Sequence, residues 1–345
     1  MSFINRSTSM VPARQLPYRT IPAPFFAIPL GLVALGLAWQ TAESIWSEPK
    51  WVSDTLIWFG ATLWIFLLII YLGKWLLRRA DAIAELDHPI QSCYIGLAGV
   101  VSLLASMGFS ATHRTLSLGC FCFGIAWTLI FAIYQAGRFW MGDCKPETLT
   151  PILYLPMVAG AFVTTGACAA MGYVDWGKLA FGGGLFTWFA IESVILLRLY
   201  TARPVLPPLR PAMGLQFAAP AVGAVAYLSV GGGTPDIFAY ALLGYALLQA
   251  LILIRLLPWL VQADLTPAWW SFSFGAASLP TAAMKLAAHR DAGAIATLAP
   301  YLFIAGNIVI AAITTVTIKW VFSSASQPPS ASRPQLMSEH FQKIA

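Results

Sequence analysis

Glu192 is the one acid well inside an apolar stretch of this chain, in the segment Phe189-Ala-Ile-Glu-Ser-Val194. A carboxyl group in hydrocarbon is costly, so an acid inside a membrane span is a candidate for proton coupling. The favoured alternative is a structural role, in which the carboxylate pairs within the protein and interlocks neighbouring helices. The residue type alone leaves both interpretations open.

Two phenylalanines, Phe272 and Phe274, come just before a run of small residues that begins at Gly275. An aromatic ring in a narrow, uncharged tube can block ions by its bulk and by excluding water. Residues two apart on a helix face roughly opposite sides, so only one of the two rings can point at a common axis. The pattern alone does not choose between them, and packing in a core or against lipid explains either ring as well.

An aromatic residue stands shortly before a proline or glycine at five places, spaced at intervals of about 60 residues. The pairs are Phe26 with Pro29, Tyr94 with Gly96, Tyr154 with Pro156, Phe217 with Pro220, and Phe274 with Gly275. A proline bends a spanning helix, and the carbonyls it frees are tolerated only against protein or a watery cavity. The repeat therefore predicts kink and pore-lining residues, although ordinary kinks in a helix bundle are the alternative.

Motifs for other chemistry are absent from the sequence. It contains no phosphate-binding loop, no dinucleotide fingerprint, no helical His-Glu-x-x-His and no Asp-rich metal motif. Cys93, Cys120, Cys122 and Cys168 fall in apolar stretches and Cys144 in a loop, so neither a disulfide framework nor a zinc site is expected. We expect no enzyme, no cofactor and no metal.

Composition identifies the elements that must position these residues. Hydrophobic residues make up 59% of the 345, charged residues 10%, and the mean hydropathy is +0.73, which is typical of a polytopic membrane protein. A spanning helix needs about 20 apolar residues. The sequence predicts ten spans, at residues 24 to 42, 53 to 76, 90 to 108, 114 to 139, 151 to 171, 176 to 199, 211 to 230, 237 to 260, 267 to 288 and 294 to 322.

The distribution of Lys and Arg predicts the orientation of these spans. Only Lys50, Arg114, Lys178, Lys285 and Arg290 fall on one side, and the other 15 of the 20 fall on the side that carries both termini. The positive-inside rule then puts both termini in the cytoplasm. Residues 1–22 and 323–345 are predicted cytoplasmic tails, the second disordered, so the net charge of +6 requires no nucleic-acid partner.

The spans pair into five hairpins, each an odd-numbered span followed by an even-numbered one. The aromatic and kink signals all occur in odd spans, which are also rich in Gly and Ala, as in Val158 to Ala170. Small residues permit close helix packing. Even spans such as Leu56 to Leu77 carry larger side chains suited to lipid. We expect an all-α protein with an inner ring of odd helices around a central pore and an outer ring of even helices.

Four segments give the chain a specific resemblance. Phe26 to Trp39, Leu153 to Pro156, Arg255 to Trp259 and Trp270 to Gly275 resemble the tellurite-resistance/dicarboxylate transporter family. The likeness is greatest to its bacterial TehA-type channels and more distant to the plant guard-cell slow anion channels. It runs from about Pro22 to Trp320 in order and at similar spacing.

The resemblance implies ten helices in five hairpins, a homotrimer in the bacterial inner membrane with one pore per subunit, and an inner-ring phenylalanine as plug. Matching the Trp-x-Phe-Ser-Phe-Gly segment residue by residue carries that gate to Phe274. The predicted function is thus a gated channel for small inorganic or organic anions. The alternative is a secondary transporter for tellurite, sulfite or C4-dicarboxylates, coupled to protons through Glu192.

Lys285, His289 and Arg290 end the ninth predicted span on the outer side. They could concentrate anions at a pore mouth, but a solvated loop explains them equally well.

Overall fold

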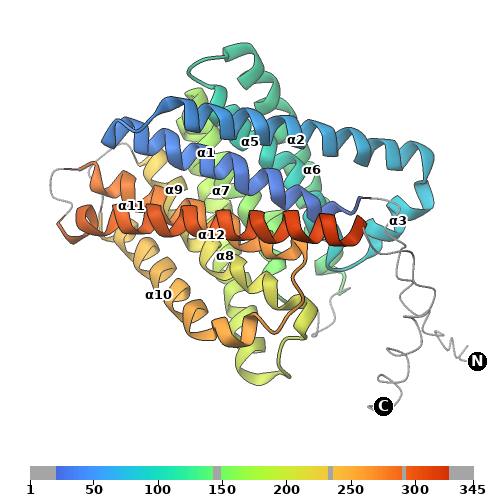
Figure 1. Ribbon diagram of the computed structural model, residues 1–345. Helices are drawn as coiled ribbons and strands as arrows, with labels where there is room; N and C mark the ends of the chain where they lie inside the picture. Colours follow the sequence, from blue (N-terminus) through green and yellow to red (C-terminus); the bar gives the residue numbers. More distant parts are fainter. Residues whose placement is uncertain (1–20, 143–148, 232–235, 290–292, 326–345) are drawn as a thin grey trace, which may run out of the picture.

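The computed structural model describes residues 21–142, 149–231, 236–289 and 293–325, and these contain helices and no strand (Figure 1). Almost all of both predicted tails, Cys144 and Arg290 lie outside the described residues. The long helices are α1 (Ala27–Trp46), α2 (Lys50–Leu77), α5 (Leu97–Phe109), α6 (Arg114–Trp140), α7 (Gly160–Met171), α8 (Val174–Thr201), α9 (Leu215–Val230), α10 (Ile237–Leu260), α11 (Ser273–Ala287) and α12 (Ala294–Ala325).

A short helical segment precedes the main helix of each of the five odd spans. These segments are η1 (Ala23–Phe26), α4 (Gln91–Ile95), η3 (Pro151–Leu153) with η4 (Leu155–Ala159), η5 (Pro207–Gly214) and η6 (Pro267–Phe272). All except η4, which is a π-helical turn, and α4 are 3-10 helices. The aromatic and kink residues of the sequence repeat lie at or just after these joints, because a missing N–H or a changed hydrogen-bond register is tolerated there.

Nine helical stretches in the described part of the chain are long and apolar enough to cross a membrane, which supports a multi-pass membrane protein. They correspond to every predicted span except the ninth. That span, formed by η6 and α11, carries Ser271, Ser273, Ser278, Thr281 and Lys285 and is less apolar than the others. The total of ten spans stays a prediction.

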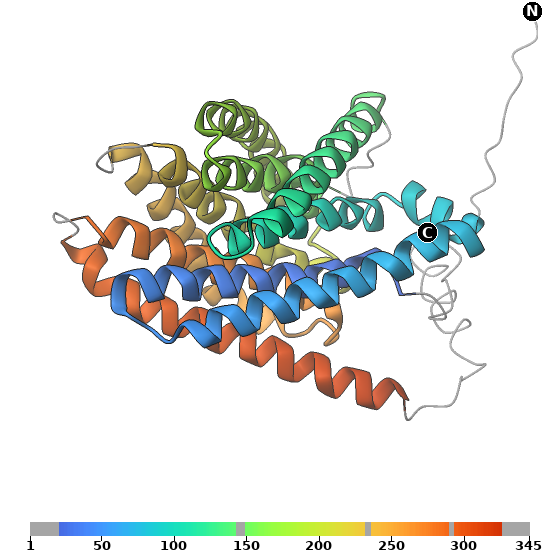
Figure 2. The ribbon, with the colours of Figure 1, turned by 90° about the horizontal axis from the view of Figure 1, so that it is seen from above.

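Burial separates the odd from the even stretches. Among the nine, the most apolar windows of the odd stretches are 67–94% buried within the protein, whereas those of the even stretches are 22–33% buried. The even helices α2, α6, α8, α10 and α12 accordingly expose large apolar side chains such as Phe66, Ile130 and Phe186. In Figures 1 and 2, α2 lies along the outside of α1, and α3 (Arg79–Asp87) lies beyond the end of α2.

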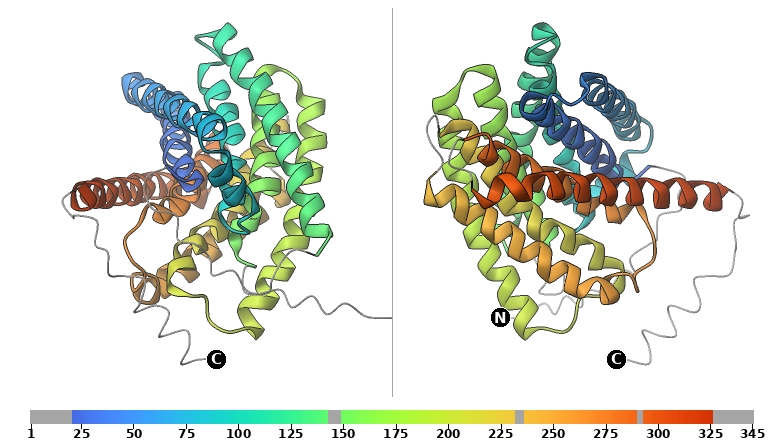
Figure 3. Two further views of the ribbon diagram at one scale, coloured as in Figure 1. Left: turned by 90° about the vertical axis from the view of Figure 1, so that its right-hand side faces the viewer. Right: turned by 60° about the vertical axis from the view of Figure 1, so that its left-hand side comes forward.

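The buried helices contact one another in chain order. α1 packs on α5, α5 on α7, α7 on α9 and α9 on α11, and α11 also packs on α1. Each of these five helices packs as well on the long helix that follows it in the chain. The two views of Figure 3 show the long helices gathered around the shorter, buried ones.

Glycines set the close approach of α1 and α2. A Cβ atom added at Gly36 would lie 2.6 Å from Ile57 of α2, and one added at Gly60 would lie 2.6 Å from Val33 of α1. Each helix thus inserts a β-branched side chain opposite a glycine of the other. The small residues seen in the sequence serve this packing.

A buried ion pair fixes the end of α2 against the start of α1. The ammonium of Lys74 lies 2.7 Å from the carboxylate of Glu85 in α3, and the side chains are 4% and 1% exposed. The other oxygen of Glu85 accepts a hydrogen bond from the backbone N–H of Ala23 at 2.7 Å. Lys74, one of the 15 cations counted on the predicted cytoplasmic side, is thus buried and paired.

Candidate functional site

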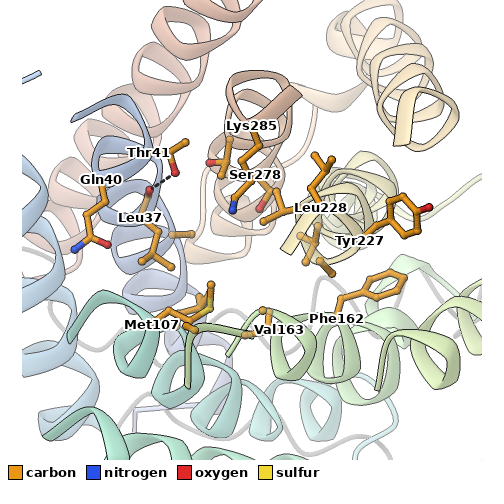
Figure 4. A pocket seen from close by; sticks show the side chains of 18 of the residues that line it. Leu37, Gln40, Thr41, Met107, Phe162, Val163, Tyr227, Leu228, Ser278 and Lys285 are labelled. Carbon is orange, nitrogen blue, oxygen red and sulfur yellow. Dashed lines mark hydrogen bonds between the residues drawn. The ribbon is translucent and has the colours of Figure 1, made fainter. Parts of the chain in front are cut away.

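A cavity of about 530 Å³ lies among α1, α5, α7, α9 and α11 (Figure 4). Apolar side chains form much of its wall, including Leu37, Met107, Phe162 and Leu228. Five helices that are far apart in sequence therefore supply one shared wall.

One face of α11 runs the length of this cavity. Phe274, Ser278, Thr281 and Lys285 all line it, and their spacing of four, three and four residues places them in a single row on a helix. Phe274 and Lys285 are eleven positions apart, which is about 16 Å along the helix axis. The row passes from an aromatic ring through two hydroxyl side chains to an ammonium group.

Phe274 stands at the inner end of the cavity. It is 3% exposed, and it also lines a second cavity of about 10 Å³ formed with Tyr154, Phe162 and Leu215 among others. Phe162 and Val222 border both spaces too. The ring of Phe274 thus takes part in the wall between an open cavity and a space with room for little more than a single water.

Phe272 lies elsewhere. It borders neither cavity. Its ring stacks on Trp269 with centroids 5.6 Å apart and covers Gly214, where an added Cβ would approach the ring to 2.6 Å. The two phenylalanines therefore differ in surroundings as the two-residue spacing requires.

Most of the polar side chains around the cavity use their donors within the protein. The hydroxyls of Thr41 and Thr281 donate to the carbonyls of Leu37 and Ala277 on their own helices, at 3.0 and 2.8 Å. The Gln40 amide donates to the carbonyl of Gly108 at 3.1 Å. Figure 4 marks the bond from Thr41. The two hydroxyls therefore present oxygen rather than hydrogen to the cavity, whereas the Gln40 amide keeps a second N–H.

Charged groups lie toward the open end of the cavity, its mouth, where the lining residues Asp236, Ala288 and His289 are exposed. Asp236, directly before α10, lines it together with Lys285 and His289. The carboxylate of Asp236 accepts hydrogen bonds from the hydroxyl of Tyr227 and from the backbone N–H groups of Phe238 and Ala239. The Tyr227 hydroxyl, followed by the backbone N–H of Ala239, holds the pKa of Asp236 below its ordinary value.

Glu192 of α8 is 7% exposed and does not line the large cavity. Its carboxylate accepts hydrogen bonds from the hydroxyls of Tyr154 and Tyr245 and, at 2.7 Å, from the amide of Gln216. These donors come from the joint before α7, from α10 and from α9. Within the described residues Glu192 has no cationic partner, and three neutral donors hold it in place.

The other kink candidates lie off the large cavity. Tyr154 lines only the small one. Phe26 packs on Tyr71, and Tyr94 lies 3.4 Å from the hydroxyl of Ser271. Pro29, Pro156, Phe217 and Pro220 are buried among the helices, and Gly96 and Gly275 receive the rings of Phe131 and Phe217. Their role as pore-lining residues stays a prediction.

Ser278, Thr281 and Gln40 line the cavity although none of them was predicted as a site residue. A signal was available for the first two, since polar residues at positions 278, 281 and 285 repeat at helical spacing after Phe274. Gln40 gave no such signal, because its place at the cavity depends on how α1 meets α5.

Comparison with known proteins gives consistent matches. The family model SLAC1, voltage-dependent anion channel, matches residues 20–318. The tellurite resistance protein TehA homolog of Haemophilus influenzae is 31% identical over 299 residues, covering 86% of this chain and 90% of the relative. The S-type anion channel SLAH2 of Arabidopsis thaliana is 22% identical over 316 residues, 87% of this chain and 59% of the relative. An uncharacterized transporter of Methanocaldococcus jannaschii is 23% identical over 248 residues, 65% of this chain and 72% of the relative.

Proposed function

The chain belongs to the SLAC1 family of voltage-dependent anion channels, and on that premise we propose that it is a gated channel for small anions with Phe274 as its plug. The observation that carries the proposal is the place of Phe274, buried at the boundary between a 530 Å³ cavity and a space of about 10 Å³. A ring in that place blocks ions by bulk and by excluding water. A rotamer change or a small helix shift would join the two spaces.

The proposed architecture has ten spans in five hairpins, with α1, α5, α7, α9 and α11 as an inner ring around the pore. The closed series of contacts among these helices supports it, as does the burial of their sides. The polar row on α11 supports counting this less apolar helix as the ninth span, because a pore-facing helix need not be apolar on every side.

The pore proposed here runs in the bacterial inner membrane with both termini in the cytoplasm, so that the mouth of the cavity would face the outer side. The charge asymmetry of the loops favours this orientation. A homotrimer is proposed from the resemblance, and the exposed apolar side chains of the even helices suit either lipid or neighbouring subunits.

Anion currents test the gate. Purified wild type, Phe274→Ala and Phe272→Ala are compared in planar bilayers with symmetric potassium chloride. Phe274→Ala is expected to conduct at least about tenfold more than wild type, because removing the ring opens a wetted path. Phe272→Ala, the matched control two residues away, is expected to stay near the wild-type level. A silent Phe274→Ala protein, or one surpassed by Phe272→Ala, contradicts the assignment.

A proton-coupled carrier is the second candidate, and one observation favours it. The carboxylate of Glu192 is tied through Tyr154 to the small cavity beside Phe274, so a change in its protonation would rearrange a wall of that space. The relative named for tellurite resistance makes tellurite a natural test substrate. Uptake into proteoliposomes that depends on pH and loses this dependence in Glu192→Gln favours the carrier, whereas unitary chloride currents that persist in Glu192→Gln favour the channel.

A further inference from the structure

We propose that Lys285 and Ser278 form a binding site for a small monovalent inorganic anion in the large cavity, between its mouth and Phe274. The site rests on the proposed function, because it supplies the ion that the pore would pass. Lys285 is half-buried on α11 and lines the cavity together with Ser278. Within the described part of the chain its ammonium forms neither an ion pair nor a hydrogen bond with another residue.

The geometry of α11 brings the two groups together. Side chains on a helix lean toward its N-terminus, so the stem of Lys285 runs back along the helix toward Thr281 and Ser278. Figure 4 shows the ammonium nitrogen reaching into the cavity beside Ser278. The charge is thereby held inside the cavity rather than in the solvent beyond its mouth.

The hydrogen-bond donors of the cavity wall also favour Lys285 and Ser278. Thr41, Ser44 and Thr281 donate their hydroxyl hydrogens to carbonyls of their own helices, and Gln40 donates to Gly108. Ser278 donates to no residue in the described part of the chain, and the ammonium of Lys285 has three hydrogens to offer. In the described lining, Lys285 therefore supplies an ammonium and Ser278 a hydroxyl whose hydrogens are not used within the protein, and the imidazole of His289 and the second N–H of Gln40 are further donors at the cavity.

The charge of the site decides the class of ligand. One ammonium balances one negative charge, and within the described residues no second cation lines the inner part of the cavity. Asp236 adds a negative charge at the mouth and makes no ion pair with Lys285. A dianion would remain half-neutralised beside apolar walls, at high cost. A monovalent ion such as chloride or nitrate fits the site better than sulfate or a dicarboxylate.

Conductance against chloride concentration tests the site. The ionic strength is held constant by replacing chloride with gluconate, and each variant carries Phe274→Ala so that current is measurable. Lys285→Met is expected to raise the half-saturating chloride concentration about tenfold, the effect of losing a charged hydrogen-bond donor. Lys285→Arg is expected to remain within about twofold of the parent, and Ser278→Ala to produce a smaller rise than Lys285→Met.

Lys178 provides the matched control. It is a lysine of the same predicted side, it pairs with Asp175 at 3.0 Å, and it does not line the cavity. Lys178→Met is expected to leave the half-saturating concentration unchanged. If Lys285→Met has no effect while the Phe274→Ala parent conducts, the site is wrong although the channel stands. Sulfate that competes more strongly than chloride overturns the monovalent class.

A binding measurement separates the site from the channel. Radioactive chloride is equilibrated with purified full-length protein, with Phe274 intact, for wild type, Lys285→Met and Lys178→Met. Bound chloride lost only in Lys285→Met supports the site even if no variant conducts. Equal binding by all three proteins refutes the site.

Discussion

At the scale of the residue, Glu192 owes its place to neutral donors. Two tyrosine hydroxyls and one amide converge on its carboxylate from three different helical elements. A carboxylate accepts all three, whereas a protonated carboxyl must itself donate and would lose at least one of them. The cluster therefore joins α8, α9 and α10. A change in the protonation of Glu192 would alter its hydrogen bond with Tyr154, which lines the small cavity.

His88, between α3 and α4, provides a pH-dependent contact outside the spans. Its Nδ1 accepts hydrogen bonds from the backbone N–H groups of Ile90 and Gln91, each at 3.2 Å. Only a ring unprotonated at Nδ1 can accept them. Burial lowers the pKa of His88 from its ordinary 6.5, and Glu85 opposes that shift only in part.

We therefore expect the unfolding free energy to fall as pH drops below about 6.5, because there the unfolded chain binds more protons than the folded one. The contribution is fully present above 6.5 and is about 1 kcal/mol, the size of one capping interaction. His88→Asn keeps a hydrogen-bond acceptor that does not titrate. The variant should therefore show a weaker dependence of stability on pH, measured by thermal unfolding of the detergent-purified protein between pH 5 and pH 8. If the stability of the variant depends on pH as strongly as that of the wild type, His88 is not the source of the pH dependence.

At the scale of the element, the joints before the odd spans explain the sequence repeat. Each main helix is preceded by a short helical segment with its own hydrogen-bond pattern. Aromatic rings at these joints fill the space where backbones meet closely, as Phe131 does at Gly96 and Phe217 at Gly275. The repeat thus marks where the main helices begin, and of its residues Phe274 lines the large cavity.

The crossing of α1 and α2 depends on Gly60. A Cβ there would lie 2.6 Å from a methyl carbon of Val33 and 3.2 Å from its backbone nitrogen, which cannot move aside as a side chain can. We expect Gly60→Ala to lower the free energy of unfolding by about 1–3 kcal/mol, measured by unfolding of the purified protein in detergent.

Gly73 is the matched control on the same helix, since nothing lies within 4 Å of a Cβ added there. Gly73→Ala should be neutral or stabilising by up to about 1 kcal/mol through helix propensity. If Gly60→Ala and Gly73→Ala lower the free energy of unfolding equally, the close approach of α1 and α2 does not contribute to stability.

At the scale of the whole molecule, charge is arranged along the cavity. Lys285 lies inside it, and Asp236 lies near the mouth with a pKa held below its ordinary value, so it stays ionised at neutral pH. The negative charge repels entering anions, and this repulsion is screened by salt.

Asp236→Asn is therefore expected to raise anion conductance about twofold at low salt and to have no effect at about 1 M salt, where the Debye length is only about 3 Å. The current is recorded on the Phe274→Ala background. Asparagine preserves the cap of α10, so the change is electrostatic. Asp175→Asn, at an exposed carboxylate that does not line the cavity, serves as control. A gain that persists at high salt would indicate a structural effect of the substitution.

The sequence by itself determined the class of the protein. An apolar composition with few charges cannot cover a soluble globule, and the family inferred from Phe26 to Trp39 and Trp270 to Gly275 is confirmed. Within the described residues, nine of the predicted spans appear as long apolar helices, because a segment in hydrocarbon must satisfy its backbone hydrogen bonds internally, as a helix does. The number of spans, the ring and the gate remain predictions.

Only the tertiary structure decided which side chains share a space. Contacts between distant segments determine the different surroundings of Phe272 and Phe274 and the three hydrogen-bond donors of Glu192. They also determine the ion pair of Lys74 with Glu85 and the place of Lys285 and Ser278 at one cavity. Hydropathy and charge are properties of each segment by itself, so they predict which segments lie in the membrane. Which face of a helix meets which neighbour follows from packing, where a single glycine or ring sets the distance of approach.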